Sequence, residues 1–178
     1  AGMLEGKEVA WLPSYGPEMR GGTANCAVTV SDDPVGSPVI ANDATCAEIM
    51  NLPSMKFVKD VVPGGHILVN SSLIDTKVDR DDVKVTYIPA NDIAGEMGMP
   101  KVANMIMLGA CLKVTNAVDI ESVLHAFLKV FGERKSKFIP INREALQKGM
   151  DAVDFMIANN VHKEDIVVTQ DYGLAAMI

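Results

Sequence analysis

Short apolar runs alternate with longer amphipathic stretches along this chain, a pattern typical of folds that mix strands and helices. The short runs are bounded by Gly, Pro, Asn or Asp and predict strands over 7–12, 23–31, 38–41, 66–69, 83–88 and 165–169. The longer stretches follow capping or helix-starting residues, among them Asp43, Ser54, Pro100, Asp119 and Asn142. They predict helices over 43–50, 54–62, 101–114, 119–131 and 143–159.

The alternation of strands and helices predicts an α/β fold with right-handed crossovers. We expect three layers, with a mostly parallel sheet covered by helices on both faces. The composition agrees, because 48% of the residues are hydrophobic and only 5% are aromatic. Val, Ile, Leu, Met and Ala must therefore build the core, as is usual for buried parallel strands. The stretch over 101–114 is apolar all round and predicts a buried helix.

Charge and cysteine usage narrow the range of partners. The formal net charge of −7 argues against a surface that follows phosphates, so we expect no nucleic acid. Cys26, Cys46 and Cys111 form no C-x-x-C pair, which excludes the common local spacings of zinc and iron–sulfur ligands. Three cysteines scattered along the chain are typical of a protein in a reducing compartment. No apolar run reaches the roughly 18 residues that are needed to cross a bilayer. Because we also recognise no signal peptide, we expect a cytoplasmic protein.

One glycine-rich loop is the strongest candidate for a site. It follows the first predicted strand, and open α/β sheets bind ligands at the carboxyl ends of their strands. Its glycines permit close backbone approach, and Arg20 offers a planar fork for a carboxylate or phosphate. The alternative is a tight connection in which an Arg20–Glu18 pair only braces the loop, and spacing alone does not separate the two. The candidate residues for binding a partner or ligand are Ser14, Tyr15, Gly16, Glu18, Arg20, Gly21, Gly22, Thr23 and Asn25.

A second candidate edge lies after the strand over 66–69. Asn70, Ser71 and Ser72 could line the same cleft as the loop, although small polar residues also simply form turns. Asn104, near the start of the apolar helix, either joins this edge or is a satisfied structural asparagine. The histidines are isolated from one another and from nucleophiles, so no catalytic residue can be named and no metal is expected.

The stretch over 9–26 (VAWLPSYGPEMRGGTANC) closely resembles the gamma subunits of 2-oxoacid:ferredoxin oxidoreductases, most of all the 2-oxoglutarate and 2-oxoisovalerate branches. Further similarity lies in the segments PGG over 63–65, LVNSSLI over 68–74, IPA over 88–90, KVANM over 101–105, LGA over 108–110 and NREALQKG over 142–149. The resemblance covers residues 1 to about 150. It implies a fold like domain III of pyruvate:ferredoxin oxidoreductase, and we treat 1–150 as one gamma-type domain.

The resemblance implies a subunit that supports catalysis and is inactive alone. Such a complex oxidatively decarboxylates a 2-oxoacid to an acyl-coenzyme A and passes the electrons to ferredoxin. The expected partners are alpha and beta subunits, a ferredoxin-like delta subunit in some complexes, and ferredoxin itself. Thiamine diphosphate, iron–sulfur clusters and coenzyme A would bind elsewhere in the complex, and the loop after Ser14 would pack near the catalytic subunits.

Two departures leave alternatives open. The family begins with a strand, a Gly-Gly-Gln-Gly-type loop and a helix, which have no counterpart here, so that loop is not carried over. Residues 151–178 instead resemble the YaiI/YqxD family of small bacterial proteins, which is similar to PIN-type nucleases, with Asp165 and Asp171 at acidic positions. This tail could complete the same sheet. The alternatives are thus a stand-alone small-molecule or nucleotide binder and a metal-dependent nuclease built on the tail.

Overall fold

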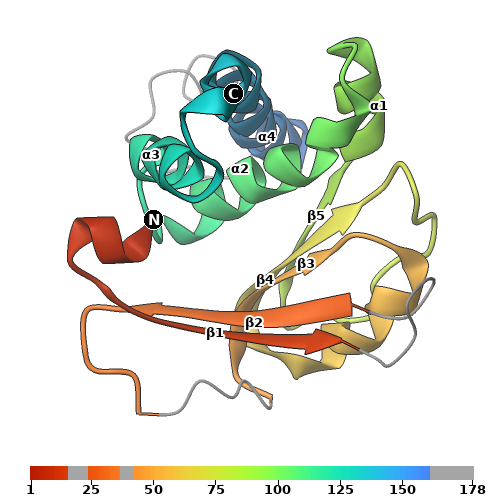
Figure 1. Cartoon of the computed structure of the whole chain (residues 1–178). Helices are drawn as coiled ribbons and strands as arrows, with labels where there is room; N and C mark the ends of the chain where they lie inside the picture. The colour runs from red at the N-terminus through yellow and green to blue at the C-terminus, as the bar shows by residue number, and fades with distance from the viewer. Residues whose placement is uncertain (16–23, 37–41, 161–178) are drawn as a thin grey trace.

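The computed structural model describes residues 1–15, 24–36 and 42–160, and it divides their strands into two separate sheets. One sheet is an antiparallel hairpin of β1 (Glu8–Tyr15) and β2 (Ala24–Ser31). The other holds β3 (Ala44–Ile49), β4 (Val61–Asn70) and β5 (Lys84–Ile88), all parallel, in the order β3-β4-β5. Figure 1 shows the hairpin below the parallel sheet and the main helices above it.

The larger helices cover one face of the parallel sheet. They are α2 (Ala103–Thr115) and α4 (Ile139–Asn160), and α3 (Ile120–Phe131) packs on these two helices. The shorter α1 (Ala90–Glu96) and η3 (Pro100–Val102) lead into α2. Leu68 and Ile88 of the sheet pack here against Ile106 and Met107 of α2, and all four are fully buried. Among the helices of the described residues, none is both long and apolar enough to cross a membrane.

The opposite face of the sheet is covered by η2 (Leu52–Asp60), a single 3₁₀ segment, and by the chain that follows β4. Ile49, Ile67 and Val69 point to this side, where they meet Val58 and Ile74. The predicted α/β fold with a parallel sheet flanked by helices is therefore confirmed. Two further 3₁₀ segments complete the fold: η1 (Gly2–Glu5) before the hairpin and η4 (Glu133–Phe138) between α3 and α4.

The prediction of a helix over 43–50 is wrong, because these residues form the edge strand β3. Ala, Glu and Met are common in helices, but helix propensity is a small effect that tertiary packing often overrides. Here Ile49 packs on the η2 side of the sheet, while Cys46 packs on the α2 side. Only the two-residue period of a strand allows both contacts. The helix predicted over 54–62 is also altered, because it is a 3₁₀ segment that ends at Asp60.

The other predicted elements lie close to the observed ones. Asp119 caps α3, accepting a hydrogen bond from the backbone amide of Glu121 at 2.7 Å, and α2 is buried as expected. The predicted strands over 38–41 and 165–169 lie outside the described residues. The helix α4 runs through position 150, so the proposed boundary between 1–150 and the tail falls inside a helix, and the tail's role in the sheet remains a prediction.

Candidate functional site

The three parallel strands end at one edge, and Asn70 at the end of β4 ties that edge together. Its side chain is fully buried, and its amide nitrogen donates to the backbone oxygen of Met50, just after β3, at 3.2 Å. The same nitrogen donates to the Asn91 side-chain oxygen, in the first turn of α1, at 2.8 Å. The backbone amide of Ser71 donates to the Ile88 oxygen at the end of β5 at 2.9 Å. Asn70 and Ser71 thus meet residues from the ends of β3 and β5 at this edge, whereas the cleft that they were expected to share with the loop stays a prediction.

The partners of these residues favour a structural role for most of the cluster. The Ser72 hydroxyl donates to the Asp92 carboxylate at 2.9 Å and accepts from the Asp92 backbone amide at 3.1 Å. This exchange satisfies one of the unpaired amides at the start of α1, as a capping residue does. One acceptor remains, because the Asn70 side-chain oxygen is buried without a hydrogen-bond partner among the described residues. A donor from water or a ligand would gain an interaction there.

Asn104 does not belong to this edge cluster. It lies in the first turn of α2, is exposed, and makes no hydrogen bond to the described residues of the edge. Because Asn104 is exposed, it is not the buried structural asparagine that the sequence offered as one alternative, and its role at the cleft stays a prediction.

The two strands that flank the glycine-rich loop form the hairpin and are not part of the parallel sheet. Ser14 pairs with Asn25, and Tyr15 with Ala24, at the end of the β1–β2 ladder. Among the described strands, β1 pairs with the antiparallel β2 and is not part of the parallel sheet, so the strand before the loop differs from the expected parallel strand, whereas the position of the loop itself stays a prediction. The remaining candidates, Gly16, Glu18, Arg20, Gly21, Gly22 and Thr23, lie outside the described residues.

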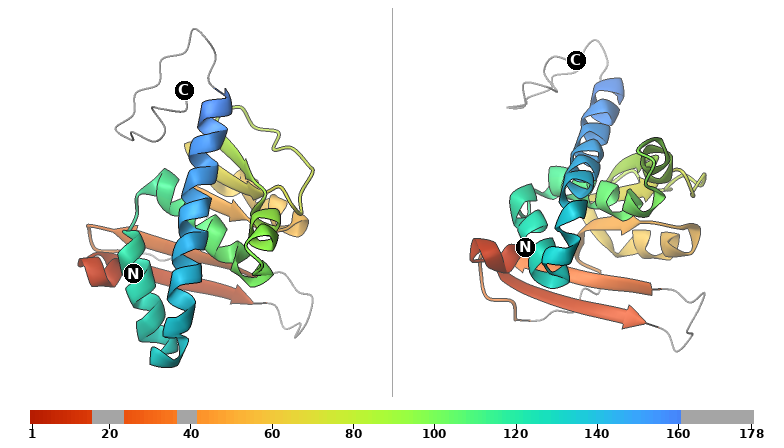
Figure 2. Two further views of the ribbon diagram at one scale, coloured as in Figure 1. Left: turned by 90° about the horizontal axis from the view of Figure 1, so that it is seen from above. Right: turned by 45° about the horizontal axis from the view of Figure 1, so that its top comes forward.

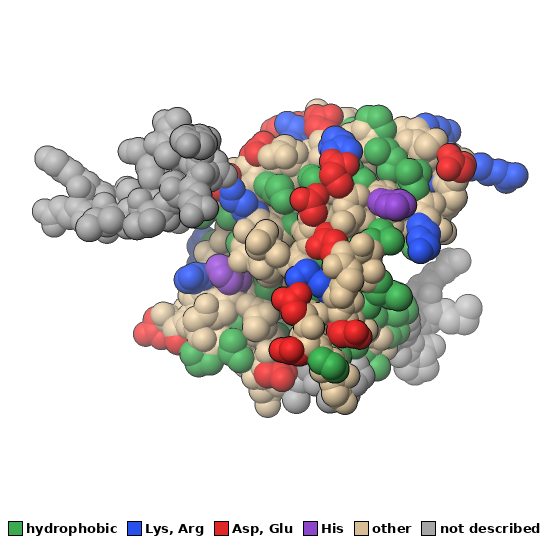
Figure 3. Space-filling model, turned by 90° about the vertical axis from the view of Figure 1, so that its left-hand side faces the viewer, with side chains coloured by type: hydrophobic (Ala, Val, Ile, Leu, Met, Phe, Trp, Pro, Cys, Tyr) green, Lys and Arg blue, Asp and Glu red, His purple; other side chains and the backbone are tan. Residues whose placement is uncertain are grey.

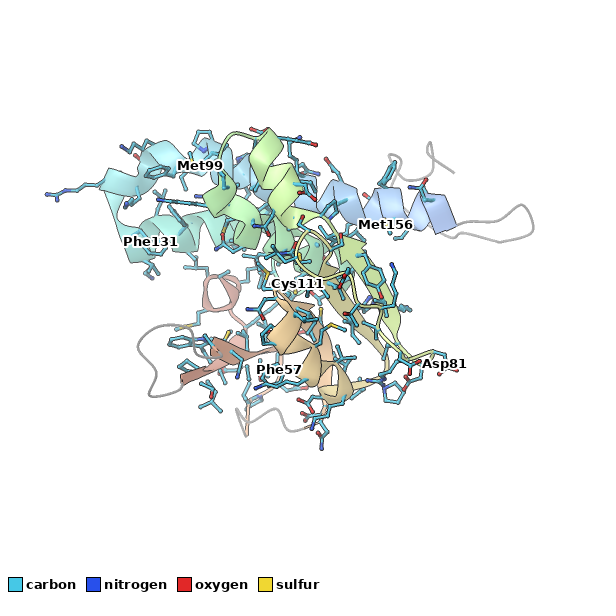
Figure 4. The ribbon with its side chains drawn as sticks, turned by 90° about the vertical axis from the view of Figure 1, so that its right-hand side faces the viewer. Phe57, Asp81, Met99, Cys111, Phe131 and Met156 are labelled. Atoms are coloured by element: carbon cyan, nitrogen blue, oxygen red, sulfur yellow. The ribbon has the colours of Figure 1, made fainter. Side chains whose placement is uncertain are left out.

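A group of residues that the sequence did not bring together lies between β3 and α2. The sulfur atoms of Cys46 and Cys111 are 3.9 Å apart (Figure 4 labels Cys111), and Glu48 stands two positions after Cys46 on the same face of β3. The two-residue period of a strand was the available signal, but the helix predicted over 43–50 concealed it.

The protonation of this group argues against nucleophilic chemistry. The contact with Cys46, followed by burial, raises the pKa of Cys111 far above the ordinary range of a thiol. Burial also raises the pKa of Glu48, although a hydrogen bond from Cys111 lowers it in part and the edge strand leaves much of the side chain in solvent. A thiol is a nucleophile only as thiolate, so Cys111 is held in its unreactive form.

The described part of the chain offers no evident place for a metal or cluster. No group of three or more His, Cys, Asp or Glu side chains within it is arranged to hold a metal ion. Cys26 is exposed on the hairpin, whereas the other two thiols meet beneath α2. The three cysteines therefore do not form the thiolate set that binds an iron–sulfur cluster.

Comparison with known proteins identifies what this scaffold is similar to. The family model described as pyruvate ferredoxin/flavodoxin oxidoreductase matches residues 1–152. The 2-oxoglutarate synthase subunit KorC of Methanocaldococcus jannaschii is 36% identical over 130 residues, which are 72% of this chain and 70% of KorC. The ketoisovalerate oxidoreductase subunit VorA of Methanothermobacter marburgensis is 35% identical over 153 residues, or 85% of this chain, but the chain spans only 31% of VorA.

A solved structure agrees with these relatives. The gamma subunit of a keto/oxoacid ferredoxin oxidoreductase from Geobacter sulfurreducens superposes with a TM-score of 0.67 and 28% identity, covering 84% of this chain and 82% of that one. The resemblance stated for residues 1 to about 150 is thereby confirmed.

Proposed function

Because the chain belongs to the pyruvate ferredoxin/flavodoxin oxidoreductase family, we propose that it is the gamma-type part of a 2-oxoacid:ferredoxin oxidoreductase. It supports the conversion of a 2-oxoacid to an acyl-coenzyme A by docking onto catalytic subunits, and it is inactive alone. Thiamine diphosphate, coenzyme A and iron–sulfur clusters bind to other parts of this cytoplasmic assembly, and ferredoxin accepts the electrons. Alpha and beta subunits, and in some assemblies a ferredoxin-like delta subunit, complete it.

The observation that carries the proposal is the apolar surface of the β1–β2 hairpin. Trp11 is 64% exposed and Val28 is 55% exposed, and the two residues pair across the ladder, so their side chains share one face. Leu12, on the other face, is 41% exposed. A two-stranded ribbon is only marginally stable in water by itself. Contiguous exposed apolar groups with a tryptophan at their centre are typical of protein interfaces.

The base of the hairpin is anchored, so the arm is presented in a defined direction. Gly2 of η1 lies so close to Val9 and Val30 that an added Cβ would approach the Val9 side chain to 2.7 Å. Glu5 in turn accepts a hydrogen bond from the backbone amide of Asp119, at the start of α3, at 2.7 Å. The face that carries Trp11 therefore begins at a fixed contact with the helical body.

This proposal is tested by the double variant Trp11→Ser, Val28→Ser in the assembly co-expressed with its other subunits. We expect recovery of the intact complex to fall by about tenfold, as is typical when an interface loses a central aromatic residue. The matched control is Leu73→Ser, which removes a side chain that is 57% exposed but lies outside the hairpin. Circular dichroism checks that each variant keeps its helices.

Complex recovery and acyl-coenzyme A production equal to the parent would refute docking through the hairpin. A turnover measured on the isolated chain would refute the supporting role itself. The stand-alone binder has less support, because Asn70 and Ser72 already bond to Met50, Asn91 and Asp92.

A further inference from the structure

A second exposed surface lies at the opposite end of α3 from the hairpin anchor. It comprises the last turn of α3 and the segment η4, over residues 129–138, and we refer to it as the basic corner. The 12 residues of α3 separate it from Asp119 by roughly 16 Å. Figure 2 shows the end of α3 and the start of α4 projecting beyond the strands, and Figure 4 labels Phe131 at this outer end.

The basic corner exposes apolar side chains that the fold does not need to expose. Val130 is 75% exposed and Phe131 is 58% exposed. The Phe131 ring is held in place by Phe127, with ring centroids 4.8 Å apart and planes tilted by 48°. A prepositioned aromatic ring loses little conformational entropy when a partner covers it, which favours recognition.

The charge of the basic corner is opposite to that of the whole chain. Lys129, Arg134, Lys135 and Lys137 are four of the chain's 16 basic residues, and Glu133 is the one acidic residue among positions 129–137. All are exposed, and none of the four cations forms an ion pair with a described carboxylate. Figure 3 shows Lys and Arg side chains beside hydrophobic ones at the upper right of this view, whereas acidic side chains gather toward the middle.

A purely structural explanation accounts for only part of this surface. A lysine in the last turn of a helix stabilises the helix dipole, which explains Lys129. Lys135 and Lys137 lie 5.3 Å from the centroid of the Phe138 ring, so cation–π contacts explain their orientation. Neither effect requires Val130 and Phe131 to face solvent beside uncompensated cations.

An open depression continues the basic corner along the first turns of α4. Its volume is about 520 Å³, and it is lined by Ile120, Ile139 and Pro140 together with Arg143, Glu144 and Gln147. Because η4 leads directly into Ile139, which lines the depression, the depression follows the basic corner along the chain. Arg143 is paired with Glu121, and Glu144 also lines the depression, so the depression adds apolar surface beside the basic corner, and the unpaired positive charge comes from the corner itself.

We propose that the basic corner docks an acidic protein surface, as a second contact of this chain within the assembly. The inference rests on the proposed function, since it takes the partner to be another chain of the same complex. A protein fits better than an anionic membrane, because the net charge of −7 would repel the bilayer and the apolar group is small. The same net charge opposes nucleic acid.

The primary test is lysine acylation read by mass spectrometry, on the free chain and on the purified assembly. We expect Lys129, Lys135 and Lys137 to be labelled about tenfold less in the assembly, because partner contact excludes the reagent. Carbodiimide should then cross-link these lysines to Asp or Glu of a partner chain. Equal labelling in both states would overturn the inference but not the proposed function. If no assembly forms, the proposed function fails and the inference fails with it.

A charge-reversal pair separates the specific contact from net charge. The variant Arg134→Glu, Lys135→Glu, Lys137→Glu should weaken assembly about tenfold and reduce its salt dependence. The control makes the same change in net charge at three scattered exposed lysines, Lys59, Lys101 and Lys148, and should assemble like the parent. Equal effects of the two triples would overturn the inference. The inference would also be overturned if the parent chain bound phosphatidylserine vesicles or duplex DNA and only the first triple variant lost this binding.

Discussion

The crossing of α2 and α4 depends on two glycines, and Gly109→Ala tests this contact most directly. A Cβ built on Gly109 would lie 2.7 Å from the carbonyl carbon of Leu146 and nearer still to its oxygen. A Cβ built on Gly149 would lie 2.8 Å from the carbonyl carbon of Ile106. In both cases the obstacle is the backbone of the facing helix, so no side-chain rotation can relieve the overlap.

The magnitude follows from what the helices must do to admit one methyl group. They must separate by roughly 1 Å, and a gap of that size forfeits a quarter to a half of each dispersion contact across it. Ile106, Met107 and Leu146 are fully buried near this crossing. Overpacking of such a core costs about 3 kcal/mol, whereas alanine gains about 1 kcal/mol in helix propensity. We therefore expect a net loss of about 2 kcal/mol, or a Tm lower by about 4–8 °C.

The assay is thermal and urea unfolding of the full chain, followed by circular dichroism. The matched control is Gly95→Ala in α1, where an added Cβ meets no atom within 4 Å. This variant should be as stable as the parent or more stable by up to about 1 kcal/mol. Both substitutions remove the same backbone freedom from the unfolded chain, so their difference isolates the close approach. If Gly109→Ala unfolded at or above the parent temperature, the reasoning about this crossing would be wrong.

Further variants test polar contacts of the fold. Asn70→Ala leaves two acceptors without their donor and should lower the free energy of unfolding, measured with urea, by about 2 kcal/mol. The control Asn104→Ala, at an exposed position, should change the free energy of unfolding by less than about 0.5 kcal/mol. A hydrogen bond from Arg80 lowers the pKa of Asp82 below its ordinary value of 3.8. The stability that this pair adds is therefore present above pH 3.8 and is lost as the pH falls through the lowered pKa. In Arg80→Ala this acid-induced loss of stability should disappear, as measured by the urea midpoint at a series of pH values.

Local signals in the sequence were sufficient for the helices that pack by an apolar stripe. The stretch over 119–131 has a capping aspartate and helical spacing, and α3 begins at Ile120 as those signals require. Such elements are encoded within a dozen neighbouring residues. The segment over 43–50 was misassigned because its strand conformation depends on pairing with β4, whose residues lie about 20 positions away.

The position of the candidate loop depended on strand pairing that the local pattern does not contain. The sequence predicts strands over 7–12 and 23–31, but it does not say whether they run antiparallel as a hairpin or parallel through a crossover. The structure extends β1 through Pro13 and Ser14 to Tyr15, which makes a hairpin of eight paired positions. Proline is tolerated in such a strand, because one of its edges is left without a sheet partner.

Two groups of residues affect the assembly in physically different ways with separable consequences. Gly109 and Gly149 act inside the fold, where they let two helices touch, and their substitution should lower stability and assembly together. Trp11 and Val28 contribute little to folding stability because their side chains are exposed to solvent. Their substitution should therefore reduce assembly and leave the Tm unchanged. A motif match cannot distinguish these classes, but the pairing of the two measurements can. If the hairpin variants lowered the Tm as much as Gly109→Ala does, the hairpin would have to be counted as part of the core and not as a docking arm.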